Sequence, residues 1–213
     1  MINKRIKEGI KKAGKPGARI RFSLGTIAVM AFCLMLLITA TFTSIKTSFN
    51  IPESSVGTTF RFEYIPQIPV VLFIAALLGE VWGTLTILIY IIAGLTPYFP
   101  VFALGGGPGY IFQYNFGYIF GFLVAVMLAA KRLKKGTNLL NLVLATLIGI
   151  VAIHLTGIIY LTVIALLRHD SLDFITNMIY YQSVSKLLYD VVFGFMAVLI
   201  GRGCRKLLRF VSG

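Results

Sequence analysis

The chain has 213 residues, 58% of them hydrophobic and 13% charged, with a formal net charge of +13, and its mean hydropathy is +0.89. A water-soluble domain of this size cannot bury so much apolar surface, so the composition excludes an ordinary soluble enzyme. A bilayer core roughly 30 Å thick needs about 20 apolar residues for each helical crossing, and this length allows several crossings.

Six apolar runs predict an all-α, polytopic membrane protein with six transmembrane helices. The runs cover residues 24–44, 64–79, 81–96, 110–130, 139–167 and 178–200. Only residues 79–83 join the second and third runs, which predicts a tight helical hairpin. The first run is too long for the apolar part of a signal peptide, so we expect it to be retained. The predicted organisation is a basic segment 1–22, a membrane domain 23–201 and a basic tail 202–213.

The basic residues predict how the chain is oriented. Sixteen of the 20 Lys and Arg residues lie in three clusters, at residues 4–21, 131–135 and 202–209. The positive-inside rule assigns all three clusters, and with them both termini, to the cytoplasm. We therefore expect a multi-pass protein of a bacterial plasma membrane. Its positive charge is then explained by its orientation in the lipid bilayer, and no nucleic-acid partner is predicted.

The connection 97–109 falls on the predicted outer side and is apolar, yet it is rich in proline and glycine. Non-helical apolar backbone is tolerated at a membrane where protein buries it or where it lines a cavity. The segment is therefore predicted to be a lid over a binding pocket. Its glycines are not followed by the Lys and Ser or Thr of a nucleotide-binding loop, which leaves a simple turn as the alternative.

Two ionisable residues in the sixth apolar run are the sharpest sign of a ligand site. Lys186 and Asp190 are four residues apart, so on a helix they share a face, and a charge in the hydrocarbon is costly unless it is paired or hydrated. Lys186 suits a carboxylate, and Asp190 suits N–H groups. The alternative is an ion pair between the two.

Other polar residues are candidates for the same pocket. Asn115 lies in an aromatic stretch that opens the fourth run, and Gln67 begins the second run. A buried amide needs hydrogen-bonding partners, and a ligand can supply them. His154 has no second ligand at metal spacing, so we expect it to hydrogen-bond a neighbour and predict no metal site.

Several segments of the sequence resemble BioY, the biotin-specific substrate-binding (S) subunit of energy-coupling-factor (ECF) transporters. The matching features are Phe99–Ala103, Gly105–Gly107, Phe116–Phe122, Gln67, Leu78–Gly79, Trp82–Gly83, Tyr90 and Gly94, spread over most of residues 60–125. The resemblance implies a vitamin-capturing subunit rather than an enzyme. It also implies a transmembrane coupling subunit and two cytoplasmic ATPase subunits as partners, so that ATP is bound by the partners only and this chain needs no cofactor.

The resemblance also implies which residues hold biotin: an Asn near the fourth helix and an Asp-x-x-Lys pair on the sixth. Asn115 fits, whereas the order Lys186-x-x-x-Asp190 is reversed and one residue wider. We expect Lys186 at the carboxylate, and Asn115 and Asp190 at the ureido group. The other expected contacts are Gln67, Phe102, Gly106, Tyr110 and Tyr118.

Two other functions stay open at this point. One is an S subunit for another carboxylated vitamin or cofactor, because the Lys186 and Asp190 arrangement departs from the family pattern. The other is a membrane-embedded enzyme with His154 or Asp190 as its base, against which the lack of a second catalytic group counts.

Overall fold

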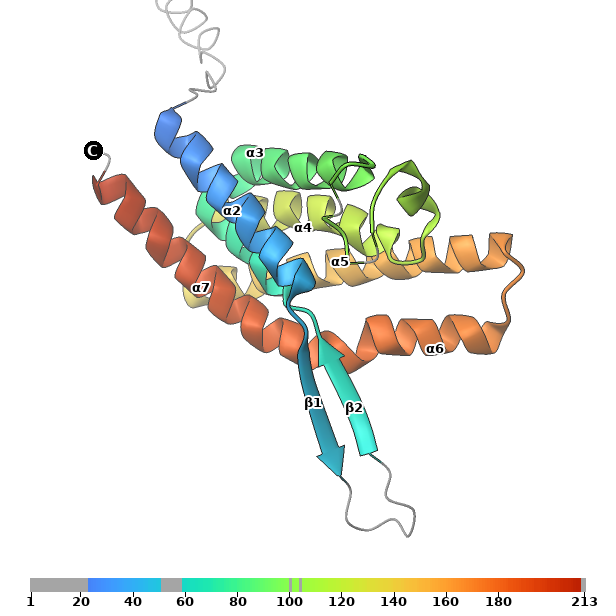
Figure 1. Cartoon of the computed structure of the whole chain (residues 1–213). Helices are drawn as coiled ribbons and strands as arrows, with labels where there is room; N and C mark the ends of the chain where they lie inside the picture. Colours follow the sequence, from blue (N-terminus) through green and yellow to red (C-terminus); the bar gives the residue numbers. More distant parts are fainter. Residues whose placement is uncertain (1–22, 51–58, 100, 104, 212–213) are drawn as a thin grey trace, which may run out of the picture.

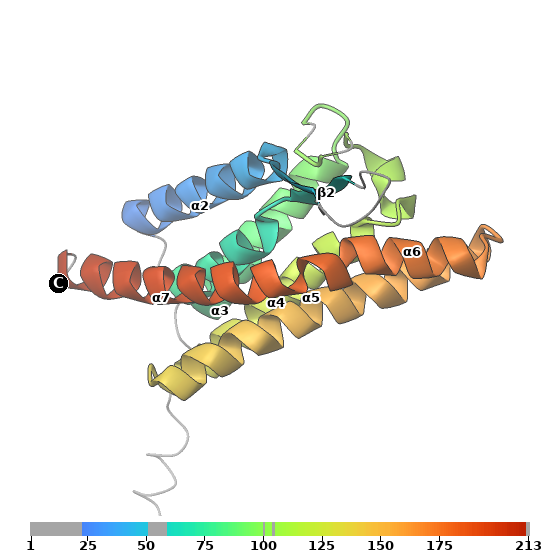
Figure 2. The same ribbon diagram turned by 90° about the horizontal axis from the view of Figure 1, so that it is seen from below.

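The computed structural model describes residues 23–50, 59–99, 101–103 and 105–211. In chain order the elements are α2 (Leu24–Phe42), β1 (Ile45–Asn50), β2 (Thr59–Tyr64), α3 (Gln67–Leu95), the 3-10 helix η1 (Pro108–Phe112), α4 (Phe116–Lys134), α5 (Leu139–Leu167), α6 (Leu172–Gln182), the 3-10 turn η2 (Val184–Lys186) and α7 (Leu187–Val211). In Figure 1, α4, α5 and the second half of α3 run side by side, and α2 and α7 cross them obliquely. Seen from below, α2 and α5 lie on opposite sides of the bundle (Figure 2).

Five helical stretches among the described residues are long and apolar enough to cross a membrane: 24–42, 67–95, 116–134, 139–167 and 172–208. The prediction of a helical, polytopic chain is therefore confirmed. The difference from the predicted six lies in α3, where the second and third apolar runs form one helical element.

A sharp break at Gly79 divides α3 into two halves that run in different directions (Figure 1). Gly79 has φ +79°, which glycine adopts without the clash of a Cβ atom, and the Arg205 guanidinium lies against it, with Nη1 3.0 Å from the position of a Cβ. The turn between the second and third apolar runs is shorter than the predicted connection 79–83, because only Gly79 leaves the helical conformation and the helix continues from Glu80.

The connection between α2 and α3, which lies between the first two predicted helices, contains an antiparallel β-hairpin. Strand β1 pairs with β2 from Ile45 opposite Tyr64 to Asn50 opposite Thr59, and the two strands project away from the helices (Figure 1). The alternation of apolar and polar residues in Phe60–Tyr64 is the strand signal that a search for long apolar runs overlooks.

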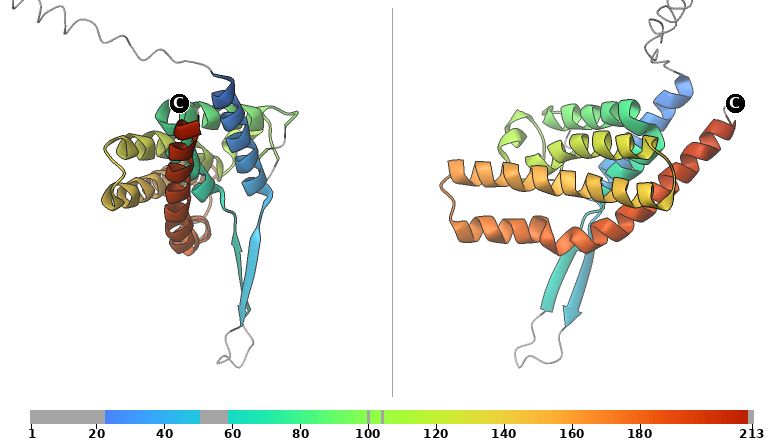
Figure 3. Two further views of the ribbon diagram at one scale, coloured as in Figure 1. Left: turned by 90° about the vertical axis from the view of Figure 1, so that its left-hand side faces the viewer. Right: turned by 180° about the vertical axis from the view of Figure 1, so that it is seen from behind.

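The sixth apolar run, predicted as one helix, is interrupted. Helix α6 ends at Gln182, Ser183 leaves the helical region with φ −122° and ψ −62°, and α7 begins at Leu187 after the short turn η2. Figure 3 shows α6 and α7 meeting at an angle. Helix α7 then continues to Val211, through most of the segment predicted as a tail; the segment 1–22 lies outside the described residues.

Candidate binding pocket

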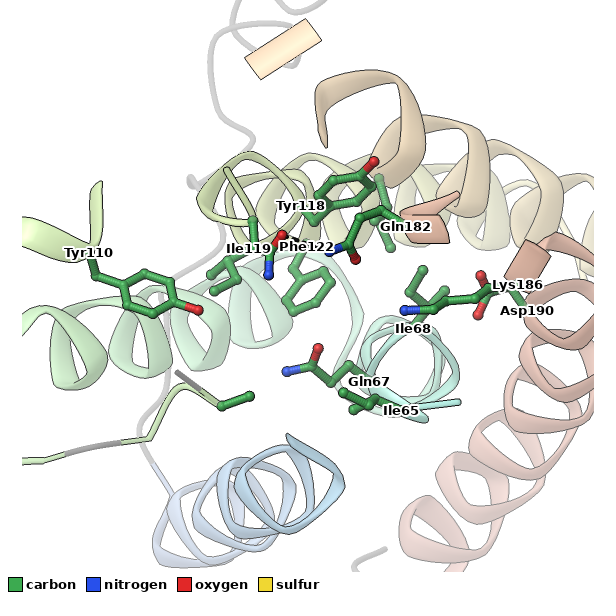
Figure 4. Close-up of a pocket in the computed structure, with 13 residues that line it drawn as sticks. Ile65, Gln67, Ile68, Tyr110, Tyr118, Ile119, Phe122, Gln182, Lys186 and Asp190 are labelled. Atoms are coloured by element: carbon green, nitrogen blue, oxygen red, sulfur yellow. Dashed lines mark hydrogen bonds between the residues drawn. The ribbon is translucent and has the colours of Figure 1, made fainter. Parts of the chain in front are cut away.

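A pocket lies where the first half of α3, the start of α4 and the junction of α6 with α7 come together (Figure 4). Six of the eight predicted binding residues line it: Gln67, Tyr110, Asn115, Tyr118, Lys186 and Asp190. Apolar side chains, including those of Ile68, Ile119 and Phe122, form much of the remaining wall. The pocket therefore combines an apolar wall with a few polar groups, which is typical of small-molecule sites.

Asp190 is held by hydrogen bonds from two distant parts of the chain. Tyr64 at the end of β2 donates its hydroxyl to Oδ1 at 2.8 Å, and His154 Nε2 on α5 lies 3.1 Å from Oδ2. Asp190 is only 1% exposed. Burial and the neighbouring Asp190 carboxylate raise the pKa of Tyr64, so this hydroxyl stays protonated and able to donate.

The placement of the two side chains bears on the two interpretations of the Lys186 and Asp190 pair. No ion pair joins the two side chains in the part of the chain that the structure describes. The Lys186 ammonium instead extends into the pocket, toward the space between Gln67 and Gln182 (Figure 4). A cation placed in this way is available to an anionic ligand.

Asn115 and Tyr118 tie the start of α4 to the α6–α7 junction. Gln182 Nε2 donates to Asn115 Oδ1 at 2.9 Å, and the hydroxyl oxygens of Tyr118 and Ser183 are 2.8 Å apart. Gln182 also lines the pocket and was missed from the sequence. Its position four residues before Lys186, which on a continuous helix is the same face, was the available signal.

Gln67 is part of a small polar cluster at the base of the pocket. Its Nε2 donates to Thr41 Oγ1 at 2.8 Å, and that hydroxyl lies 2.9 Å from the Tyr90 hydroxyl. The cluster links α2 to both halves of α3. Because its NH₂ group donates to the hydroxyls of both Thr41 and Tyr90, the carbonyl oxygen of Gln67 is the part of its amide left for a ligand.

The described residues of the connection 97–109 pack mainly on the second half of α3. The Phe102 ring packs directly against Gly94, where a Cβ would collide with it, and the Gly107 N–H donates to the Gly94 carbonyl at 2.9 Å. Phe102 is 1% exposed and contacts the Tyr110 ring, with centroids 4.6 Å apart.

Because of this packing, two of the eight predicted binding residues, Phe102 and Gly106, are not among the described residues that line the pocket. Both lie against the second half of α3, since a Cβ on Gly106 would be 2.8 Å from the Gly94 carbonyl oxygen. Ala103 and Tyr110 instead reach the pocket from this connection and from η1. Burial raises the pKa of Tyr110, so its hydroxyl enters the pocket in the neutral form.

A comparison with known protein families identifies the family of this chain. A family model described as the BioY family matches residues 15–210. The chain belongs to the BioY family. The resemblance seen in the sequence is thereby confirmed over nearly the whole chain.

Individual BioY relatives agree with this assignment. A probable biotin transporter BioY from Lysinibacillus sphaericus is 35% identical over 100 residues, which are 46% of this chain and 50% of that protein. The aligned region therefore spans about half the length of this curated relative. A crystal structure of the S-component for biotin from an ECF-type ABC transporter matches with a TM-score of 0.65 and 20% identity, over 87% of this chain and 95% of that one, and shows a shared fold.

Proposed function

We propose that this BioY protein is the biotin-binding S subunit of an ECF-type transporter. The observation that carries the proposal is the pocket itself, in which the Lys186 ammonium and the polar groups of Asn115 and Asp190 face an apolar space. Biotin has a carboxylate at one end, a ureido ring at the other and an apolar thioether ring and chain between them. The pocket offers a partner for each of these parts.

The proposed contacts follow from the chemistry of the side chains. Lys186 binds the carboxylate, Asn115 and Asp190 bind the ureido group, and the apolar wall packs on the rest of the ligand. Gln67, Tyr110 and Tyr118 surround it, Phe102 and Gly106 act by holding the connection 97–109 in place, and that connection covers the pocket as a lid. Each Asp190 oxygen keeps a lone pair beyond the bonds from Tyr64 and His154, so an N–H of the ligand finds an acceptor there.

The proposed topology has six crossings, with both termini in the cytoplasm of a bacterial cell and α3 crossing twice on either side of Gly79. Side-chain contacts support a single basic face. Lys134 Nζ is 2.5 Å from Glu80 Oε2, and Arg205 packs on the adjacent Gly79. The clusters at 131–135 and 202–209 therefore meet at the same end of the bundle, opposite the pocket, as the positive-inside rule requires.

In this proposal the chain captures the vitamin and its partners supply the energy. A transmembrane coupling subunit and two cytoplasmic ATPase subunits complete the transporter, and ATP binds only to the ATPases. Membership of the BioY family favours this function over a membrane-embedded enzyme, and the engagement of both His154 and Asp190 in one buried network argues against either as a free base.

Uptake of labelled biotin tests the proposed function. Cells that lack other biotin uptake, and that produce this chain with the coupling and ATPase subunits, are expected to accumulate radiolabelled biotin until excess unlabelled biotin competes. Cells with the partner subunits alone serve as the control. Accumulation of a different carboxylated vitamin, with none of biotin, would support the alternative S subunit, and conversion of a substrate without the ATPases would support the enzyme.

A further inference from the structure

We infer that Gln182 is a ligand-binding residue, which together with Asn115 recognises the ureido group of the ligand. The inference rests on the proposed function and assigns a role to a side chain that the sequence analysis overlooked. Gln182 is the last residue of α6 and Asn115 immediately precedes α4. Both line the pocket, and their amides are joined by a 2.9 Å hydrogen bond.

Asn115 is not occupied by its own helix. It stands at the N-cap position of α4, yet its side chain makes no capping hydrogen bond. Its amide instead accepts the bond from Gln182, which crosses from the α6–α7 junction. The break after Gln182 is what brings this amide over the start of α4, and Figure 4 shows Gln182 facing Gln67 across the pocket. We call these two residues, Asn115 and Gln182, the amide pair.

Counting donors and acceptors shows what the amide pair offers a ligand. In their mutual hydrogen bond, Gln182 donates one N–H and Asn115 accepts with its carbonyl oxygen. The Asn115 NH₂ group and the Gln182 carbonyl oxygen are left over. The same outcome, one NH₂ group and one carbonyl oxygen, holds if the two amides exchange roles as donor and acceptor. The amide pair thus presents a donor and an acceptor side by side.

A cyclic urea is complementary to this arrangement. It has one carbonyl oxygen and two N–H groups, so a complete site needs one donor and two acceptors. Asn115 donates to the carbonyl, Asp190 accepts one N–H, and Gln182 accepts the other. Without Gln182 the second N–H loses this acceptor, and a polar group that loses its partner in a buried site is costly.

The amide pair also accounts for discrimination among carboxylated cofactors. A ligand that carries a carboxylate but no urea satisfies Lys186 and leaves the Asn115 NH₂ group and the Gln182 carbonyl oxygen without a ligand partner. Sites built to hydrogen-bond a polar group reject analogues that lack it by large factors, for the same reason. The amide pair therefore selects the ring, whereas Lys186 selects the charge.

The substitution Gln182→Glu tests this role with almost no change of shape. A carboxylate only accepts hydrogen bonds, so Asn115 must turn its NH₂ toward Glu and present its oxygen to the ureido carbonyl. Biotin affinity, measured by calorimetry on the full-length protein in detergent, is expected to fall on the order of 100-fold. Gln113→Glu, which changes an exposed side chain in the same region, is the matched control and is expected to leave affinity unchanged.

Binding of a second ligand shows whether Gln182 recognises the ligand by hydrogen bonding or acts only through packing. In 2-iminobiotin a guanidinium, which has only N–H donors, replaces the urea. The Gln182→Glu variant is expected to bind it more tightly than the wild type does. Unchanged biotin affinity in the variant would overturn the inference and leave the proposed function standing. Loss of both ligands would also overturn it, because Gln182 would then act only through packing. Failure of the wild type to bind biotin would overturn the proposed function, and the inference with it.

Discussion

Replacing Lys186 by alanine is expected to weaken biotin binding roughly 30- to 1,000-fold and the binding of biotin amide far less. Lys186 lines the pocket and makes no close ion pair with Asp190, so we expect its ammonium group to contact the ligand carboxylate. Removing one partner of a desolvated charge pair costs about 2–4 kcal/mol, and each 1.4 kcal/mol is about a factor of ten in affinity. Biotin amide has no charge to lose.

Calorimetric titration of both ligands into wild type and variant measures this difference. Lys206→Ala removes an exposed cation from the far end of α7 and is the matched control, with both affinities expected to stay as in the wild type. If Lys186→Ala weakens biotin and biotin amide equally, Lys186 supports the structure of the pocket rather than the carboxylate.

Replacing Asp190 by alanine is expected to have the largest effect on stability. The change leaves the Tyr64 hydroxyl and the His154 Nε2–H without their acceptor in a buried site. Each buried donor that loses its partner costs about 1–3 kcal/mol, so the free energy of unfolding should fall by about 2–6 kcal/mol. Biotin binding should fall as well, because the proposed acceptor for a ureido N–H is gone.

Thermal unfolding of the ligand-free protein in detergent, followed by tyrosine and tryptophan fluorescence, checks the stability change. Asp190→Asn keeps the size of the side chain and one acceptor oxygen, and should lose less. Asp173→Ala removes an exposed carboxylate from α6 and should unfold as the wild type does. An Asp190→Ala protein that unfolds at the wild-type temperature would show that the buried network does not stabilise the fold.

The apolar helices were the part of the fold that the sequence predicted best. Helix α5 has the predicted bounds, Leu139–Leu167, because a long apolar run there is flanked by polar residues and Asn138 caps its first turn with a bond from the Asn141 N–H. The hairpin of β1 and β2 escaped prediction because its alternating strands are short and are separated by the polar segment 51–58.

The break between α6 and α7 was missed, although four of the five residues 182–186 are polar. The prediction of one helix passed over this short polar stretch because neither Pro nor Gly marks it and apolar residues resume at Leu187. That break nevertheless decides where Gln182 and Lys186 lie. The pocket was therefore predicted in its chemistry but not in its geometry.

The hydrogen-bonding partners of Asp190 could not be predicted from the sequence either. They come from positions 126 and 36 residues away in the chain, and helical periodicity says nothing about such distant contacts. The prediction that His154 hydrogen-bonds a neighbour was confirmed, but only the fold identifies Asp190 as that neighbour.

The most direct measurement of the central claim is a calorimetric titration of purified, ligand-depleted protein with biotin, accompanied by thermal unfolding with and without the ligand. The account predicts saturable binding to one site, a higher unfolding temperature with biotin, and weaker binding of biotin amide. A folded protein that gives neither a saturable heat nor thermal stabilisation with biotin would contradict the proposed function.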